Sequence, residues 1–250
     1  MSFVRVQDSS GVAVATLDRP PANALNAEVF EELSQAFKEG RSSQAVVLAS
    51  ALPTIFSAGW DLPTVLQLDR RGMEEFLERF GDLVRQIFVF GPPTVVALPG
   101  HAIAGGLILA AAGDERFASS GKGQLGLSEV MLGVPVPECC LEIFRHVIGF
   151  RAMERLASTG ENLSVEAARG IGLVDRVVET GGDLLEQAVE RARFLADRPA
   201  TAYAAIKRRA RAAAVARFDQ ARREDPFLDA WFGKQAQGRI RALVEKLKKN

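Results

Sequence analysis

The sequence predicts an α/β fold in which helices cover a parallel or mixed β-sheet. Two short apolar runs typical of buried strands, Val12–Leu17 and Ala45–Ala49, stand on either side of a helix pattern. We expect that helix to start after Asn26, a good N-cap, and to end at Gly40. Its apolar residues repeat at helical spacing: Phe30, Leu33 and Phe37. A strand–helix–strand order favours parallel pairing, because the helix returns the chain across the sheet.

The composition of the 250-residue chain limits its function. Lys and Arg together number 31, as do Asp and Glu, so the net charge of zero argues against nucleic acid or an anionic membrane as partner. The two cysteines, Cys139 and Cys140, are adjacent, which suits neither a disulfide framework nor a metal site; we expect small core residues in a reducing compartment. The N-terminal MSFVRVQDSS lacks the apolar run of a signal peptide, and no apolar stretch is long enough to span a membrane. We therefore expect a cytoplasmic protein.

Local patterns define the other elements of the first half. Val4–Gln7 and Val12–Leu17 flank a Ser-Ser-Gly turn, which predicts a β-hairpin. Pro20 and Pro21 keep the next segment extended. Ile55–Leu62 (IFSAGWDL) predicts a strand followed by a glycine turn. Met73–Phe90 predicts an amphipathic helix, which a Gly-Pro-Pro triplet ends.

The central part of the chain contains a second glycine turn. An apolar strand begins at Val95, and the turn Ala104–Gly106 leads into the apolar run Leu107–Ala112, which predicts a buried helix. We expect further helices over Leu141–Ser158 and from the cap Ser164 to Gly170.

The last part of the chain is expected to be helical. Ile171–Val178 has strand character, and from Asp183 onward the pattern is helical, with breaks at Pro199 and Pro226. We divide the chain into an α/β core over residues 1–195 and a C-terminal helical region over residues 196–250, which serves oligomerisation or covers the active site.

The two glycine turns are the strongest functional signals. Ser57–Asp61 and Ala104–Gly106 each follow an apolar strand, and the second precedes a helix whose first N–H groups have no intrahelical acceptor. Two such turns can direct two backbone N–H groups at one carbonyl oxygen and form an oxyanion hole, worth about 3–4 kcal/mol per donor in other enzymes. The alternative is that each glycine only permits a tight connection. Glu129, a carboxylate among apolar residues further along the chain, would complete a site for enolate chemistry.

The chain resembles the crotonase (enoyl-CoA hydratase/isomerase) superfamily along nearly its whole length. The matching segments, in the family's order and spacing, are VATLDRPPANALN, FSAGWDL, PGHAIAGGLILAAAGDERFAS, LGLSEVMLGV and AARGIGLVDRVV. The resemblance implies a crotonase-like spiral of ββα units with a C-terminal helical region, assembled as a homotrimer or a dimer of trimers. It also implies acyl-coenzyme A thioesters as substrates, with no metal and no cofactor apart from the coenzyme A that the substrate carries.

The resemblance also implies a set of site residues. The thioester oxygen would be held by the backbone N–H groups of Trp60 and Gly105, and the bulk of the unusual Trp60 should narrow the acyl pocket. The helix Met73–Phe90 would line that pocket with Phe80, Val84 and Ile87, although core packing explains these residues equally well. The segments that meet the coenzyme include Ala22, Ala24, Ala58, Gly59, Trp60, Asp61, Leu62 and Gly105. Asp61 is expected to cap its turn rather than to take part in the chemistry.

The pattern of glutamates separates the reactions of the family. Family hydratases use two glutamates, one of which matches Glu129, while the position of the other is occupied here by Ile108. One carboxylate serves water addition poorly, but it can move a proton from C2 to C4 through an enolate. This favours a Δ3,Δ2-enoyl-CoA isomerase in which Glu129, with a pKa raised by burial, is the base.

Three alternatives remain. Glu138, in Pro137-Glu138-Cys139, resembles the catalytic glutamate of peroxisomal-type isomerases, so it is the base, a second acid for hydration, or only a charge at a helix start. Other crotonase reactions, thioester hydrolysis or decarboxylation, would use the oxyanion hole alone. A protein that binds coenzyme A esters but has lost catalysis is the remaining alternative, because Ile108 and Trp60 depart from the family's pattern. The basic run Lys207–Arg211 is expected to be a solvated helix face.

Overall fold

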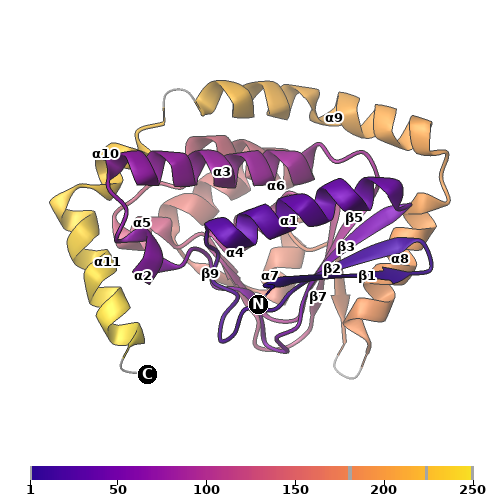
Figure 1. The fold of residues 1–250 in the computed structure, drawn as a ribbon, viewed down its shortest axis with the longest axis horizontal. Helices are drawn as coiled ribbons and strands as arrows, with labels where there is room; N and C mark the ends of the chain where they lie inside the picture. The colour runs from indigo at the N-terminus through magenta and orange to yellow at the C-terminus, as the bar shows by residue number, and fades with distance from the viewer. Residues whose placement is uncertain (1, 180–181, 223–224, 249–250) are drawn as a thin grey trace.

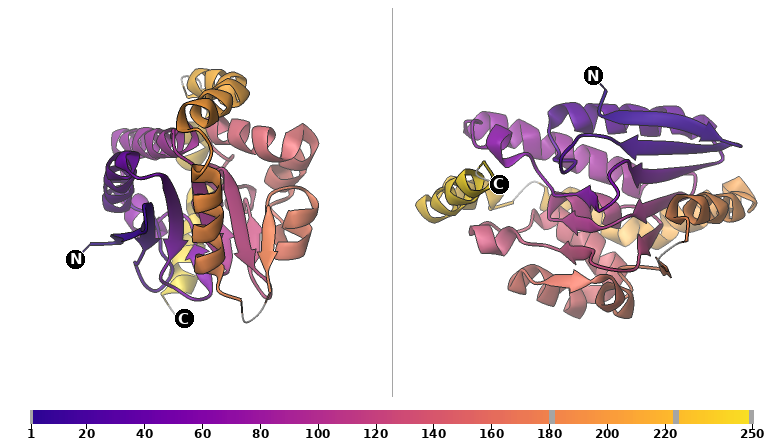
Figure 2. Two further views of the ribbon diagram at one scale, coloured as in Figure 1. Left: turned by 90° about the vertical axis from the view of Figure 1, so that its right-hand side faces the viewer. Right: turned by 90° about the horizontal axis from the view of Figure 1, so that it is seen from below.

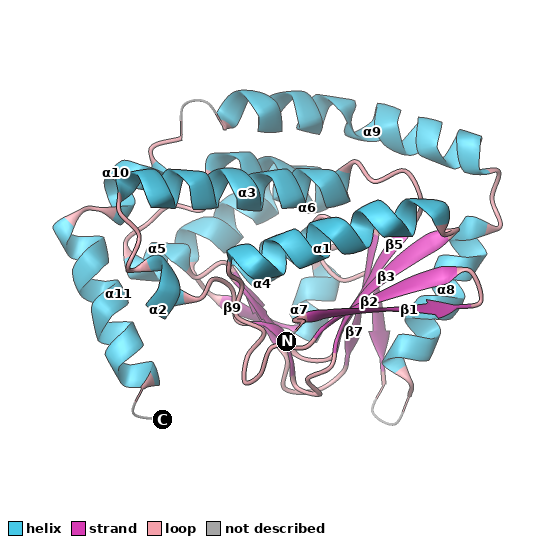
Figure 3. Cartoon of the chain, viewed as in Figure 1, coloured by secondary structure: helices cyan, strands magenta, loops and turns pink. Residues whose placement is uncertain are grey.

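The computed structural model describes residues 2–179, 182–222 and 225–248, and it confirms the α/β class (Figure 1). The strands are β1 (Val4–Ser9), β2 (Val12–Leu17), β3 (Ala45–Ser50), β4 (Ile55–Ser57), β5 (Thr94–Leu98), β6 (His101–Ile103), β7 (Glu115–Ser119), β8 (Gln124–Gly126), β9 (Asn162–Ser164) and β10 (Arg176–Val178). The helices are α1 (Ala27–Glu39), α2 (Leu62–Val65), α3 (Arg70–Phe88), α4 (Gly105–Ala111), α5 (Glu129–Leu132), α6 (Glu138–Thr159), α7 (Val165–Gly170), α8 (Leu184–Ala196), α9 (Ala200–Ala221), α10 (Phe227–Trp231) and α11 (Lys234–Leu247), with a 3-10 turn at Gly40–Ser42. Figure 3 shows the strands gathered on one side and the helices around them.

The larger sheet has six strands in the order β1-β2-β3-β5-β7-β10. β1 and β2 pair antiparallel with Val4 opposite Leu17, which confirms the predicted hairpin. The remaining neighbours pair in parallel. The sheet is therefore mixed, as expected, and the hairpin forms one of its edges.

Both faces of the larger sheet are buried, as alternate residues of β3 show. Val46 and Leu48 belong to the main core with α1 and α3, whereas Val47 lies in a second apolar cluster with Ala188 and Ala192 of α8. Figure 2 shows α8 lying against the sheet. Because helices cover both faces, residues Ala45–Ala49 of this strand are all apolar instead of alternating with polar residues.

The smaller sheet has four short strands in the order β4-β6-β8-β9, and it positions the glycine turns. β4, β6 and β8 are parallel neighbours, and β9 pairs antiparallel with β8. Because parallel strands end at the same edge, the residues that follow them come together there. These are the turns 58–61 and 104–106 and the segment 127–129.

The helices agree with the expectations except at several boundaries. Asn26 caps α1 and Gly40 ends it, but α6 starts at Glu138, before the expected Leu141, and bends at Gly149. The strand expected over Ile171–Val178 is wrong in its first part, because the chain there turns to close α7. In that turn the Leu173 N–H donates to the Ala168 carbonyl oxygen at 2.9 Å, and only Arg176–Val178 pairs.

The C-terminal part consists of the helices α8 to α11, with non-helical breaks that include Pro199 and Pro226, as predicted. Residues 223–224 and 249–250 of the expected helical region lie outside the described residues. Within 2–179, 182–222 and 225–248, no helix combines the length and the apolar character needed to cross a membrane.

The prediction that the run Lys207–Arg211 is solvated is wrong for two of its cations. The Lys207 Nζ lies 2.7 Å from Oδ2 of Asp114, and an Arg211 guanidinium nitrogen lies 2.8 Å from Oδ1, with all three side chains nearly buried. Burial lowers the pKa of Lys207 to about 8, against the opposing attraction of Asp114. Arg208 and Arg209 are exposed, as expected. The cluster joins α9 to the start of β7.

We expect Asp114→Ala to lower the free energy of unfolding by about 3–5 kcal/mol, because it leaves two buried cations without their carboxylate. Arg208→Ala and Arg209→Ala, on exposed positions of the same helix, should change it by about 0.5 kcal/mol or less. Urea unfolding at pH 7 measures all three variants. A loss in Asp114→Ala no larger than in the two controls would show that the cluster adds no net stability.

Candidate active site

The structure brings the two glycine turns into direct contact. Gly59 has φ +89°, and a Cβ added there would lie 2.9 Å from the Ile103 carbonyl oxygen and 3.2 Å from the Gly105 nitrogen. Only glycine combines this backbone conformation with so close an approach. The turn after β4 and the turn after β6 therefore form one unit.

The segment after the first hairpin holds the first turn in place. The Ala58 N–H donates to the Ala22 carbonyl oxygen at 3.0 Å. Leu25 forms two further bonds with the turn, each 2.8 Å long: its N–H donates to the Gly59 carbonyl oxygen, and its own carbonyl oxygen accepts from the Asp61 N–H. In this turn the N–H groups of Ala58 and Asp61 are used by these bonds, and the Gly59 N–H donates to the Ser57 hydroxyl at 3.1 Å. Among the described residues, neither the Trp60 N–H nor the Gly105 N–H has an acceptor.

Asn23 fixes this segment and was not identified from the sequence. It is buried with φ +47°, and its side-chain amide donates to the Phe56 carbonyl oxygen at 2.9 Å and to the Ser50 hydroxyl at 2.8 Å. Its own carbonyl oxygen accepts a bond from the Ser57 hydroxyl at 2.8 Å. The available signal was an asparagine after two prolines, since asparagine tolerates a positive φ in turns.

Asp61 has the structural role that the sequence predicts. Its side chain accepts a bond from the Thr64 N–H at 3.2 Å at the start of α2 and pairs with the Arg19 guanidinium at 2.5 Å. The other residues expected to meet the coenzyme lie on the same bonded segments. Ala22, Ala24 and Leu62 are half-buried, Gly59 is buried and Ala58 is exposed.

Glu129 is placed beside the glycine turns by the smaller sheet. The Ala104 N–H donates to the Gly126 carbonyl oxygen at 2.8 Å, so β8 leads to Glu129 along the edge at which α4 begins. The Glu129 residue is 7% exposed, and its Oε2 has no hydrogen-bond partner in the described part of the chain. Burial raises the pKa of its carboxyl to about 7. A carboxyl with this pKa accepts and returns a proton near neutral pH.

Glu138 has a different environment. It is exposed, at the first position of α6, and its backbone N–H donates to a carboxylate oxygen of Asp225 at 2.8 Å. Asp225, which the sequence marked only as a helix break, thus caps α6, and burial raises its pKa. The two candidate glutamates therefore differ in burial.

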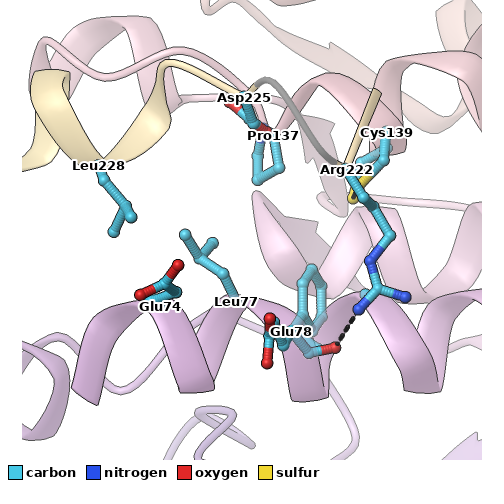
Figure 4. A pocket seen from close by; sticks show the side chains of 11 residues that line it. Glu74, Leu77, Glu78, Pro137, Cys139, Arg222, Asp225 and Leu228 are labelled. Carbon is cyan, nitrogen blue, oxygen red and sulfur yellow. Dashed lines mark hydrogen bonds between the residues drawn. The ribbon is translucent and has the colours of Figure 1, made fainter. Parts of the chain in front are cut away.

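Cys139 and Cys140 are free and buried, as predicted, with their sulfur atoms 3.9 Å apart. They line a pocket of about 150 Å³ between α3, the start of α6 and the chain around α10 (Figure 4). Of the α3 residues expected at the acyl pocket, Phe80 lines this cavity, whereas Val84 and Ile87 are core residues that do not.

The comparison with protein families identifies the family of the chain. The model described as enoyl-CoA hydratase/isomerase matches residues 7–250. The chain belongs to this family of enzymes. Ile108 is buried in α4, three residues after Gly105.

Similar members of the family have different names. Mouse mitochondrial enoyl-CoA delta isomerase 1 is 32% identical over 180 residues, which is 70% of this chain and 62% of that protein. "Probable enoyl-CoA hydratase echA17" of Mycobacterium avium (strain 104) is 32% identical over 209 residues, 82% of this chain and 80% of that protein. The crystal structure of human mitochondrial delta3-delta2-enoyl-CoA isomerase matches with a TM-score of 0.90 at 26% identity, covering 99% of this chain and 98% of that one. The fold and family are thus shown, while the similarities leave the reaction open.

The raised pKa of Glu129 makes stability depend on pH. The folded value of about 7 lies above the ordinary 4.5, so between these values the native state binds more protons and stability falls as the pH rises. We expect Glu129→Gln to gain up to about 3 kcal/mol relative to wild type between pH 5 and pH 8. Glu138→Gln, at an exposed position, should follow the wild-type curve. Urea unfolding at both pH values tests this, and a constant difference for Glu129→Gln would show that the carboxyl is not perturbed.

Proposed function

We propose that this enzyme shifts the double bond of enoyl-CoA thioesters from C3 to C2. The observation that carries the proposal is the buried carboxylate of Glu129, which has a pKa near 7 and follows β8 at the sheet edge where two backbone N–H groups lack acceptors among the described residues. Ile108 adds support, because an aliphatic side chain in that buried position supplies no second acid or base.

In this mechanism Glu129 removes a proton from C2 of a 3-enoyl thioester. The electron pair of the broken C–H bond forms a C1–C2 double bond, and the thioester carbonyl becomes an enolate oxygen. The N–H groups of Trp60 and Gly105 stabilise that oxygen, each by about 3–4 kcal/mol. The protonated Glu129 then delivers its proton to C4, the thioester carbonyl re-forms, and the double bond lies between C2 and C3. One group serves as both base and acid, which its pKa near 7 permits.

We infer the rest of the complex from the family. The segments of Ala22, Ala24, Ala58, Gly59 and Leu62 hold the coenzyme A part of the substrate, and no separate cofactor or metal takes part. The core of residues 1–195 binds the substrate, and the region 196–250 covers the site, which is supported by the contact of the Phe227 and Trp231 rings with Trp60. The subunits assemble as a trimer or as a dimer of trimers.

Hydration of 2-enoyl-CoA is the second candidate. It is favoured by the equal identity to the Mycobacterium avium protein named as a probable hydratase, and it requires Glu138 as second acid. The exposure of Glu138 and its position at the start of α6 argue against this role.

We expect Glu129→Gln to lower kcat for isomerisation of 3-hexenoyl-CoA by about 10²–10⁴-fold, the usual contribution of a general acid–base group. Glu138→Gln should keep wild-type turnover if that side chain is only a helix-start charge. Formation of 2-hexenoyl-CoA, followed by mass spectrometry after chromatographic separation, measures both. Activity retained in Glu129→Gln but lost in Glu138→Gln would move the base to Glu138.

Heavy water separates the two reactions in wild-type enzyme. With 3-hexenoyl-CoA, isomerisation should give 2-hexenoyl-CoA that carries deuterium at C2 or C4, in amounts that depend on how fast Glu129 exchanges its proton. With 2-hexenoyl-CoA, no product heavier by one molecule of water should form. A 3-hydroxyacyl product appearing at the rate of the enzyme's main reaction would establish hydration and refute the isomerase proposal.

A further inference from the structure

The indole ring of Trp60 lies directly against Gly105. A Cβ added to Gly105 would stand 2.8 Å from Cδ1 and 2.9 Å from Nε1 of that ring, and 3.6 Å from Cζ of Phe80. In the proposed mechanism the backbone N–H groups of Trp60 and Gly105 hold the thioester oxygen. The side chain of Trp60 therefore occupies space next to the carbon at which the acyl chain begins.

Four aromatic rings hold the Trp60 indole ring in this position. Phe76 and Phe80 of α3 lie 5.3 and 5.4 Å from it between ring centroids, almost perpendicular to its plane. Phe227 and Trp231 of α10 lie 5.6 and 6.4 Å away. Edge-to-face pairs of this kind add about 0.5–1.5 kcal/mol each beyond the burial of area. Contacts from two helices therefore hold the Trp60 ring in place, and we refer to Trp60 with these four rings as the aromatic wall.

The cavity of about 150 Å³ is lined by Phe80 but not by Trp60 or Gly105. Phe80 contacts Trp60 and approaches Gly105, and it also lines the cavity; in α10, Phe227 contacts Trp60 while the adjacent Leu228 lines the cavity. Figure 4 shows Leu77 and Leu228 facing one another across this space, with Glu74 and Glu78 on α3. Phe80 thus stands between Gly105 and this cavity, whose lining also contains the charged residues Glu74, Glu78, Arg222 and Asp225.

We propose that Trp60 ends the acyl site, so that the enzyme takes short-chain enoyl thioesters and excludes long ones. The inference rests on the proposed isomerase function, because that function places the thioester oxygen at Trp60 and Gly105. Trp60 thus has two roles: its backbone N–H holds the substrate oxygen, and its side chain sets the length of the acyl group.

The test is a series of 3-enoyl-CoA substrates with six, eight and ten carbons. In wild type we expect kcat/KM to fall at least about tenfold from six to ten carbons, since misfit of even one methylene in an apolar pocket changes it by about 10–200-fold. In Trp60→Leu, which keeps the backbone N–H and removes the ring, the ten-to-six ratio should rise at least about tenfold. Wild-type enzyme that uses ten carbons as well as six, or a ratio unchanged in a folded Trp60→Leu, would overturn the proposal.

Two controls distinguish the length limit from other effects. Phe90→Leu also removes an aromatic ring from the main core, where Phe90 packs on Phe37 away from the site, and it should leave the ten-to-six ratio unchanged. Trp60→Phe keeps an aromatic ring and removes a buried indole N–H that has no partner within the described residues, which offsets part of the cost of the smaller ring. We expect it to fold and to give a ratio between wild type and Trp60→Leu. If Trp60→Leu does not fold, the wild-type series and Trp60→Phe decide the question.

A separate measurement keeps the length limit apart from the proposed reaction. Both tryptophans of the chain, Trp60 and Trp231, lie in the aromatic wall, so their fluorescence reports acyl binding. Wild type should bind butyryl-CoA at least about tenfold more tightly than decanoyl-CoA, and Trp60→Leu, which retains Trp231, should lose this preference. If the wild type shows this binding preference, and Trp60→Leu loses it, but no 3-enoyl-CoA is isomerised, then the isomerase function is refuted and the length limit stands. If the wild type isomerises 3-enoyl-CoA but prefers no chain length in either the kinetic or the binding assay, then the isomerase function stands and the length limit is refuted.

Discussion

Gly59 and Gly105 approach so closely that a methyl group on Gly59 would lie 3.2 Å from the Gly105 nitrogen. This contact joins the ends of β4 and β6, and the parallel pairing of β6 with β8 then brings Glu129 to the same edge. The first turn is held by its bonds with Ala22 and Leu25, and the second by the bond from the Ala104 N–H to the Gly126 carbonyl oxygen. The geometry of the site therefore depends on main-chain packing, and side chains around it are free to differ between members of the family.

The features of the site that local chemistry determines were predictable from the sequence. Both glycine turns and the Asn26 cap follow from residues close together in the chain, and the structure has them where expected. Asn23 and the Lys207–Arg211 run depend instead on partners far along the chain, such as Phe56 and Asp114. A positive charge is solvated on most helices, so its burial becomes predictable only when a distant carboxylate is known to face it.

The burial of Glu129 opposes stability and favours chemistry. Its carboxyl has an oxygen without a partner in the part of the chain that the structure describes, and no cation shifts its pKa downward. A paired carboxylate in the same place would hold its charge at neutral pH and would be a weaker base. The native state thus retains a group that resists ionisation, and this resistance is the property that a proton-transfer group requires.

Trp60 has two proposed roles, one for its backbone N–H in the reaction and one for its side chain in limiting the space for the acyl group. In the proposed mechanism this position donates a backbone N–H to the substrate oxygen, so the side chain there is free to serve another purpose. Here the side chain is the largest available, and rings from α3 and from the C-terminal α10 pack around it. If Trp60 limits the acyl chain as proposed, α10 does more than pack on the core: by holding the Trp60 ring beside Gly105, it helps to set the length of the acyl group that the site accepts.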